Sequence, residues 1–200
     1  DIVTTGVGQH QMFASHFLTR SKPGTFITSG GSGTMGYGLP AAIGAAIGSP
    51  DKRVFVVDGD GSFQMTLQEL GTLAESGARV TIVIMDNGYL GMVRQWQELF
   101  YDKRYSGVDM SSNPDFIKIA EAYGIEGQFV SDEEGLREAF AAAAACTRGY
   151  VIHVAVEKES NILPMVPPGG KLAEFTGYCI AKTDTFFDPE DDATSDQSQG

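Results

Sequence analysis

The 200-residue chain, with 42% hydrophobic and 20% charged residues, is long enough to bury a core and suits one α/β domain, alone or with a tail. Its formal net charge of −12 argues against nucleic acid and anionic membrane surfaces as partners, because both are negatively charged. An acidic protein that holds a phosphorylated ligand needs a metal ion or a helix N-terminus to offset the repulsion.

The two cysteines, Cys146 and Cys179, lie far apart and form no CxxC motif, so they indicate neither a disulfide framework nor a zinc site. No apolar run reaches the length of a membrane-spanning helix. We therefore expect a cytoplasmic protein, or an organellar one in a eukaryote. Six acidic and no basic residues follow Lys182. This composition predicts a domain over residues 1–177 and an acidic, disordered tail over residues 178–200.

The apolar pattern alternates between short buried runs and longer amphipathic stretches. Strands are expected at residues 25–28, 53–57, 80–85 and 150–156. Helices are expected at about residues 9–20, 37–47 and 66–77, from residue 113, and from residue 131 to about 146. Such an alternation predicts an α/β fold with a doubly wound, mostly parallel sheet and helices on both faces.

Three of these helices carry start signals. Capping boxes are expected at Thr66 with Glu69 and at Ser131 with Glu134, and the pair Asn113-Pro114 is expected to open a third helix. Gly77 is the expected stop of the helix that Thr66 begins. Ligands of doubly wound sheets bind beyond the C-terminal ends of the strands, so the loops after strands are where chemistry is expected.

Two of those loops hold polar residues suited to a metal ion. Gly59-Asp60-Gly61 follows one buried strand, and Asp86-Asn87-Gly88 follows the next, 24 residues later. Two adjacent parallel strands would bring Asp60 and Asn87 to the same edge of the sheet. A carboxylate, an amide oxygen and a nearby backbone carbonyl are ligands that suit Mg²⁺. The glycines allow a phosphate to approach the backbone closely.

Two other interpretations compete for the same residues. The stretch from Asp58 to Glu69 imitates a calcium-binding EF-hand loop, but Phe63 stands at the sixth position, where that loop needs glycine, and a strand precedes it. The GxGxxG of residues 31–36, with Asp58 after the following strand, is a nicotinamide-dinucleotide fingerprint. A dinucleotide site leaves Gly59-Asp60-Gly61 and Asn87 without a role.

The spacing from Asp60 to Asn87 resembles the metal-diphosphate signature of thiamine-diphosphate enzymes. Asp86 stands where that family usually has Asn. Within it, the chain from about residue 2 to residue 170 is similar to acetohydroxyacid synthase, also called acetolactate synthase. The segments that carry the similarity are residues 6–12, 33–43, 88–96, 113–116 and 163–169, and the Met-Val-x-Gln-Trp sequence within residues 88–96 is the most particular to it.

The resemblance implies a role for each matching residue. The implied metal ligands are Asp60, Asn87 and the backbone carbonyl of Tyr89. Contacts to thiamine diphosphate are implied for Gln9, His10, Gly33, Met35, Gly59, Gly61, Ser62, Asn87 and Tyr89. Two of these are tied to catalysis: the Gly33 carbonyl would accept the 4′-amino group, and Met35 would bend the cofactor. A substrate pocket is implied at Met92, Val93 and Trp96.

The implied reaction is decarboxylation of pyruvate, followed by condensation of the hydroxyethyl carbanion with a second 2-ketoacid, either pyruvate or 2-ketobutyrate. It leads to acetolactate or acetohydroxybutyrate, early in branched-chain amino-acid biosynthesis. The family's catalytic glutamate belongs to a separate pyrimidine-binding domain, contributed across a dimer interface. We therefore expect a fragment, or half of a split enzyme, that is inactive alone and belongs to a homodimer or tetramer. A small regulatory subunit is a further expected partner.

FAD, which many members of the family carry, would be held mainly by a middle domain. Three alternatives remain open at this point. They are another thiamine-diphosphate carboligase or decarboxylase such as glyoxylate carboligase, a nicotinamide-dinucleotide domain, and a non-catalytic assembly remnant.

Overall fold

The computed structural model describes residues 1–167 and 169–177. Its contacts divide the chain into two units, residues 1–160 and residues 161–200. In the described part of the second unit, Met165 and Thr176 form an isolated antiparallel bridge. The expected acidic tail over residues 178–200 and Cys179 lie outside the described residues, so the boundary at residue 177 stays a prediction. Among the described residues, no helix is both long and apolar enough to cross a membrane.

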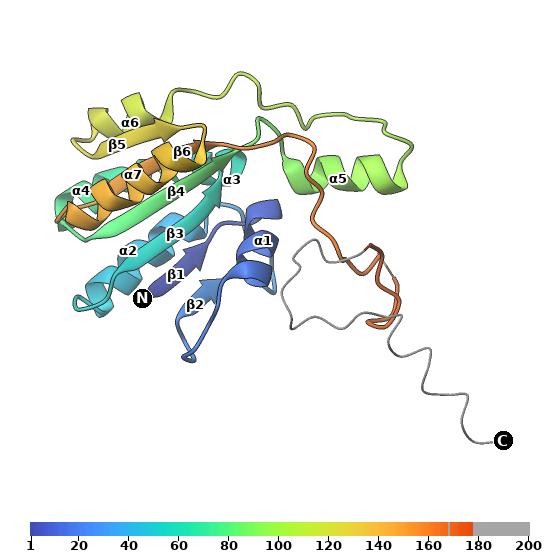
Figure 1. The fold of residues 1–200 in the computed structure, drawn as a ribbon, viewed down its shortest axis with the longest axis horizontal. Helices are drawn as coiled ribbons and strands as arrows, with labels where there is room; N and C mark the ends of the chain where they lie inside the picture. The colour runs from blue at the N-terminus through green and yellow to red at the C-terminus, as the bar shows by residue number, and fades with distance from the viewer. Residues whose placement is uncertain (168, 178–200) are drawn as a thin grey trace. The chain divides into compact units, whose positions relative to one another are not determined.

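The first unit is built on a six-stranded sheet whose neighbouring strands are all parallel (Figure 1). The strand order across the sheet is β2-β1-β3-β4-β6-β5. The strands are β1 (Ile2–Thr5), β2 (Phe26–Thr28), β3 (Val54–Gly59), β4 (Val80–Asp86), β5 (Glu126–Val130) and β6 (Tyr150–Ala155). The predicted doubly wound α/β fold is confirmed.

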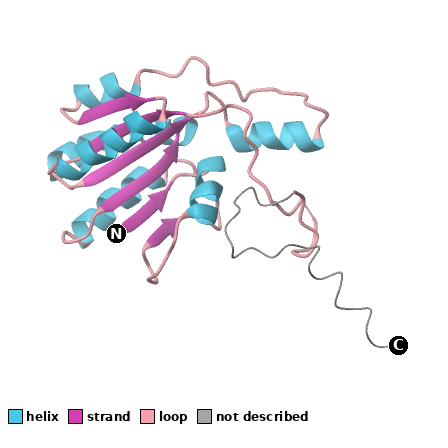
Figure 2. Cartoon of the chain, in the orientation of Figure 1, coloured by secondary structure: helices cyan, strands magenta, loops and turns pink. Residues whose placement is uncertain are grey.

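Helices cover both faces of this sheet (Figure 2). They are α1 (Gln9–Phe17), α2 (Gly38–Gly48), α3 (Asp60–Gln64), the 3₁₀ turn η1 (Leu67–Glu69), α4 (Leu70–Ser76), α5 (Gly91–Phe100), α6 (Phe116–Ala122) and α7 (Glu133–Ala145). One core cluster joins α2, α3, α4 and α6 to the sheet, and a second joins α7 to the opposite face of β4, β5 and β6. The central strands are buried on both sides, which explains their unbroken apolar sequences.

The three predicted helix starts are each placed differently by the structure. The Thr66 hydroxyl donates to the Gly36 carbonyl at 2.7 Å instead of capping a helix, and a 3₁₀ turn precedes α4. Asp115, not Asn113, caps α6 by accepting from two backbone amides. Asp132, not Ser131, caps α7 through the Gly135 amide. In α6 and α7 a neighbouring aspartate satisfies the free N–H groups, whereas η1 and α4 have no side-chain cap, so the local sequence left the choice of cap undecided.

Other differences concern element existence and length. The strands β1 and β5 and the helices α3 and α5 were not among the expected elements, and α1 ends at Phe17 rather than near residue 20. Gly77 does end α4 in the left-handed conformation, with φ of 62°, as predicted. The strand β1 lies between β2 and β3, so it brings the loop that starts at Gly6 to the same sheet edge as the loop after β3.

Candidate functional site

A cavity of about 550 Å³ lies at the C-terminal ends of the strands, in the size range of small-molecule sites. Its walls come from the start of α1, the loop before α2, the β3–α3 junction and the segment from β4 into α5. Every position expected to contact the cofactor lines it: Gln9, His10, Gly33, Met35, Gly59, Gly61, Ser62, Asn87 and Tyr89. Asp60 lines it as well.

Strand pairing explains why Asp60 and Asn87 converge. The strands β3 and β4 run parallel in a register that pairs Gly59 with Met85, so the residues that follow them emerge at the same edge. The Asn87 side chain is held in its loop, because its Oδ1 accepts from the Tyr89 amide at 3.0 Å and its Nδ2 donates to Gln9 Oε1 at 3.3 Å. The predicted convergence of the two loops is confirmed.

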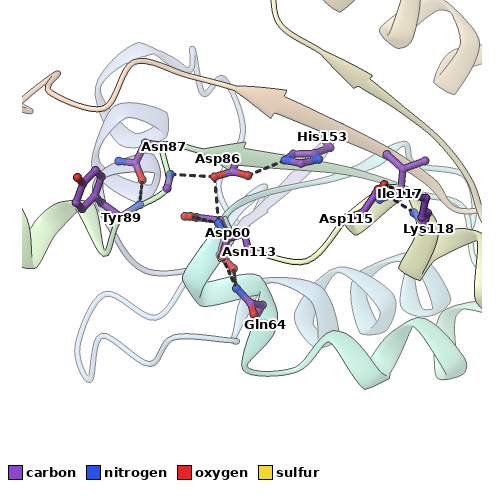
Figure 3. Close-up of polar contacts among 11 residues, drawn as sticks. Asp60, Gln64, Asp86, Asn87, Tyr89, Asn113, Asp115, Ile117, Lys118 and His153 are labelled. Carbon is purple, nitrogen blue, oxygen red and sulfur yellow. Dashed lines mark hydrogen bonds and ion pairs between the residues drawn. The ribbon is translucent and has the colours of Figure 1, made fainter. Parts of the chain in front are cut away.

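Asp60 belongs to a hydrogen-bonded cluster of acids and amides (Figure 3). Asn113 Nδ2 donates to Asp60 Oδ2 at 2.6 Å and to Asp86 Oδ1 at 3.1 Å. The other oxygen of Asp86 lies 2.8 Å from His153 Nε2. The His153 ring packs in T-shaped geometry against the rings of Phe116 and Phe129, with ring centroids 5.1 and 5.0 Å apart, respectively. The cluster thus ties the ends of β3, β4 and β6 together.

The two acids of this cluster, Asp60 and Asp86, have pKa values shifted in opposite directions. Burial, only partly opposed by the hydrogen bond from Asn113, raises the pKa of Asp60 to about 7. Burial also pushes the pKa of Asp86 upward, but hydrogen bonds from His153 and the Gly88 amide outweigh it, and the pKa of Asp86 is lowered. Within residues 1–167 and 169–177, no lysine or arginine pairs with Asp60. A bound cation would supply the missing positive charge.

The neighbouring acid Asp58 lies in a different environment. Its side chain has no exposed surface, and its Oδ1 lies 3.5 Å from His10 Nε2. Burial raises the pKa of Asp58 to about 7, and burial lowers the pKa of His10 to about 3. A fully buried carboxyl cannot contact the ribose of a dinucleotide, so the structure removes the acid that the nicotinamide interpretation needs.

Close contacts at Gly59 and Gly61 explain the glycines of this loop. A Cβ at Gly59 would lie 2.6 Å from the Nδ1 of His10, and one at Gly61 would lie 2.6 Å from the Cδ2 of Leu90. A Cβ at Gly59 would crowd the His10 ring, and one at Gly61 would require the Leu90 side chain to move. Without these Cβ atoms, the backbone itself forms this wall of the cavity. A wall of bare backbone next to a helix start is the arrangement in which proteins approach phosphate groups closely.

The donor set fits the expected metal and cofactor. Among the described residues, no group of three or more His, Cys, Asp or Glu side chains could hold a metal ion. The expected set needs only one carboxylate, from Asp60, together with an amide oxygen and a backbone carbonyl, which is oxygen chemistry suited to Mg²⁺. The cavity walls beyond these polar groups are largely apolar, as a site for an aromatic ring system requires.

The three residues expected to contact substrate lie on α5. Met92 and Val93 line both the 550 Å³ cavity and a second cavity of about 600 Å³. Trp96 lines only the second cavity, together with Gln97, Tyr101 and Arg104. Trp96 also packs edge-on against Phe100, with ring centroids 5.9 Å apart. The helix therefore places Met92 and Val93 between the two cavities.

Sequence reasoning missed two polar residues of the site. Asn113 is expected from the sequence only as a helix start, and His153 is not among the expected site residues, yet both bond Asp86. Asn113 is separated from Asp60 by 53 positions, so no local pattern connects them. The available signal was the match of residues 113–116 to the family, which marked the segment without assigning it a role.

The fold and this site together define a cofactor-binding domain of a thiamine-diphosphate-dependent enzyme. The family described as "Thiamine pyrophosphate enzyme, C-terminal TPP binding domain" matches residues 6–154, and the chain belongs to it. A solved structure of benzoylformate decarboxylase from Polynucleobacter necessarius superimposes with a TM-score of 0.74 at 27% identity, over 81% of this chain and 31% of that one.

Curated relatives are more specific in name. The chain is 45% identical over 173 residues to the acetolactate synthase isozyme 2 large subunit of Escherichia coli (strain K12), covering 86% of this chain and 32% of the relative. It is 52% identical over 178 residues to the mitochondrial acetolactate synthase catalytic subunit of Saccharomyces cerevisiae, covering 88% and 26%. The chain thus spans roughly a quarter to a third of the length of these relatives.

Proposed function

We propose that this chain is the thiamine-diphosphate- and Mg²⁺-binding part of an acetolactate synthase. The observation that carries the proposal is that ten expected cofactor and metal positions, Asp60 and Asn87 among them, line one cavity at the sheet edge. In the part of the chain that the structure describes, the buried Asp60 carboxyl also has no lysine or arginine partner. The names of the relatives support acetolactate synthase over other activities of the family.

Asp60, the Asn87 amide oxygen and the Tyr89 carbonyl would hold Mg²⁺. The loop of residues 87–89 is already folded by the hydrogen bond between Asn87 and the Tyr89 amide. The start of α1, whose cap residue Gly8 makes no side-chain cap, offers free backbone N–H groups to the diphosphate. The metal and the helix start together would offset the repulsion between an acidic protein and an anionic cofactor.

When bound, thiamine diphosphate supplies a carbon nucleophile and an electron sink for 2-ketoacid chemistry. The residues of the chain would position it. Gly33 and Met35 both line the cavity from the loop before α2, where a backbone carbonyl could accept the 4′-amino group and a thioether could support the ring. The apolar walls exclude water from the reacting carbon.

The substrates we propose are pyruvate and a second 2-ketoacid, either pyruvate or 2-ketobutyrate. Met92 and Val93, at the boundary between the two cavities, would contact the side chain of the acceptor, and Trp96 would shape the outer cavity. Apolar contacts of this kind distinguish a methyl from an ethyl group only modestly, by about 1–3 kcal/mol.

The partners follow from the same proposal. A pyrimidine-binding domain or chain would bring the glutamate that protonates the cofactor ring, within a homodimer or tetramer, and a small regulatory subunit would bind the assembly. FAD, where present, would bind mainly outside this domain. The chain alone is then expected to form no acetolactate from pyruvate.

Two alternatives are less well supported. A nicotinamide-dinucleotide site would need Asp58 at the surface, and it is buried. A non-catalytic remnant would be free to lose its ligand-binding groups, yet Asp60, Asn87 and the glycine walls are all present. A sister thiamine-diphosphate decarboxylase shares the fold, as the benzoylformate decarboxylase structure illustrates, but shares less of the sequence.

The test is a titration of the chain with thiamine diphosphate, with and without Mg²⁺, followed by the fluorescence of Trp96, its only tryptophan. We expect a saturable change that requires Mg²⁺. Thiamine, which lacks the diphosphate, is the matched control and should give no Mg²⁺-dependent change. A response to NAD instead of thiamine diphosphate would overturn the proposal in favour of the dinucleotide interpretation.

A further inference from the structure

We propose that Asn113 is the positioning residue of the metal site: it sets the orientation of the Asp60 carboxylate by donating to that carboxylate and to Asp86 at the same time. The proposal rests on the proposed function, since it assumes that Asp60 binds a divalent cation. It concerns a residue that makes no contact with the cavity itself and that follows α5 by more than ten positions.

The hydrogen bonds fix which way the Asn113 amide faces. Its Nδ2 lies between two carboxylates, at 2.6 Å from Asp60 Oδ2 and 3.1 Å from Asp86 Oδ1. The ionised Asp86 carboxylate only accepts hydrogen bonds, so this atom must be the NH₂ group. Its Oδ1 accepts from Gln64 Nε2 at 2.9 Å, and the same Nε2 also donates to the Asp60 carbonyl at 3.1 Å. The amide thus has a partner on each side, and turning it over would break the three hydrogen bonds that Asn113 makes to Asp60, Asp86 and Gln64.

The backbone brings Asn113 to this position through the loop after α5. The Leu90 amide donates to the Val108 carbonyl at 2.8 Å, and the Met110 amide donates to the Gly88 carbonyl at 2.8 Å. The segment of residues 108–110 therefore lies along the loop that carries Asn87 and Tyr89. The Asn113 amide then closes a turn onto the Met110 carbonyl at 2.9 Å. One segment consequently braces the loops after both β3 and β4.

The consequence for the metal site is electrostatic and geometric. Asp60 and Asp86, at the ends of neighbouring strands, lie within hydrogen-bonding reach of each other, and one neutral NH₂ group that donates to both holds the two side chains in one arrangement. With Oδ2 held by Asn113, the plane of the Asp60 carboxylate is fixed before a cation binds. Groups that orient a metal ligand in this way typically change metal affinity by about 10–100-fold when they are removed.

The experiment measures metal affinity separately from folding. Mn²⁺, a hard cation of similar coordination chemistry, is titrated into the full chain at saturating thiamine diphosphate, and free Mn²⁺ is counted by electron paramagnetic resonance. For Asn113→Leu, which preserves size but has no donor, we expect Mn²⁺ affinity to fall about 10–100-fold. At saturating Mn²⁺ the amplitude of the Trp96 fluorescence change should match that of the unmodified chain.

Asp115→Ala is the matched control. It removes the cap of α6 two residues away, so it should lower the melting temperature while leaving Mn²⁺ affinity unchanged. Gln64→Met, which removes the partner of the Asn113 carbonyl, should weaken Mn²⁺ binding in the same direction but less, and it serves as the second test if Asn113→Leu does not fold.

The outcomes separate this proposal from the proposed function. If the unmodified chain binds no Mn²⁺ with thiamine diphosphate, the proposed function fails. If the unmodified chain binds Mn²⁺ and the Asn113→Leu and Gln64→Met variants bind it equally well, only the positioning role fails. Equal weakening by Asp115→Ala would also overturn it, because the effect would then come from general loosening of the loop.

Discussion

Two buried acids, Asp58 and Asp60, lie two positions apart at the end of β3, and they differ in the side chains that surround them. Asp58 faces inward to His10 and has no exposed surface. Asp60 faces the cavity edge, where Asn113 and Asp86 contribute further polar atoms. Burial raises both pKa values to about 7, but the neighbours differ: His10 Nε2 lies 3.5 Å from Asp58, whereas Asp60 is hydrogen-bonded to Asn113 and Asp86. We call Asp58 with His10 the closed centre, and Asp60 with Asn113 and Asp86 the open centre, which would bind a cation.

The closed centre balances its own charge. With a pKa of about 7 for Asp58 and about 3 for His10, the folded pair holds one proton between those pH values. Unfolded Asp and His, at their model values of 3.8 and 6.5, also hold one proton over most of that range. Burial of the pair therefore makes the free energy of unfolding depend little on pH over this range. Among the described residues no lysine or arginine pairs with Asp60, so a bound cation would bring a positive charge that the Asp60 centre lacks.

The largest expected effect comes from crowding the closed centre. In Gly6→Ala the new Cβ would lie 1.7 Å from Asp58 Oδ1 and 2.4 Å from Ser62 Oγ, so a buried carboxyl must move. We expect a loss of about 3–5 kcal/mol in the free energy of unfolding, measured by urea denaturation.

Gly44→Ala is the matched control for that loss. Gly44 lies within α2, and a Cβ there meets nothing within 4 Å, so the same substitution should stabilise the chain by up to about 1 kcal/mol. A loss in Gly6→Ala no larger than the change in Gly44→Ala would contradict the close packing around Asp58.

The second prediction removes one half of the closed pair. A raised pKa in Asp58 contributes stability at low pH that is lost as pH rises through about 7, and a lowered pKa in His10 contributes stability at high pH that is lost as pH falls from 6.5 toward about 3. In the unmodified chain these two opposite changes of the free energy of unfolding with pH largely cancel. In Asp58→Asn only the change due to His10 remains.

We therefore expect Asp58→Asn to lose about 3 kcal/mol of stability relative to the unmodified chain as pH falls from 7 to 4. The measurement is urea unfolding at a series of pH values for both proteins. Asp58→Asn, His10→Gln removes both halves and should restore the original pH profile. Parallel profiles for the single variant and the unmodified chain would show that the two groups do not titrate as a buried pair.

The contrast between the centres also shows what sequence could provide. The buried runs of β3 and β4, with polar residues directly after them, sufficed to predict the fold and the convergence of Asp60 and Asn87, because parallel strands end at a common edge. The inward orientation of Asp58 could not be predicted. It depends on Gly6 and Gly38 leaving room for its carboxyl, and these glycines belong to segments distant in sequence.

The same limit applies to Asn113. In the sequence, Asn113-Pro114 has the composition of a helix start, and only the return of residues 108–110 along the Asn87 loop carries Asn113 to the acids instead. Asn and Asp are similarly favoured as helix caps, so the sequence does not distinguish them. Asp115 is the cap because it directly precedes α6 and reaches the Ile117 and Lys118 amides. Contacts between distant segments, which no single window of sequence contains, decide the rest.

The last prediction tests the open centre directly. Asp60→Asn retains the shape of the side chain but removes the charge that a cation would neutralise, and Asn113 would then face an amide in place of a carboxylate. With thiamine diphosphate present, we expect the Mg²⁺ concentration for half-maximal Trp96 fluorescence change to rise at least about 100-fold, equivalent to about 3 kcal/mol. Asp109→Asn makes the same change at an exposed carboxylate on the adjoining segment and should have little effect.

In the unmodified chain the Mg²⁺ concentration for half-maximal fluorescence change should fall as pH rises from 6 to 8. The reason is that the cation binds the ionised form of Asp60, whose pKa without metal is about 7. A flat pH profile together with an unchanged Asp60→Asn variant would mean that Asp60, like Asp58, belongs to a closed centre and that the metal binds elsewhere.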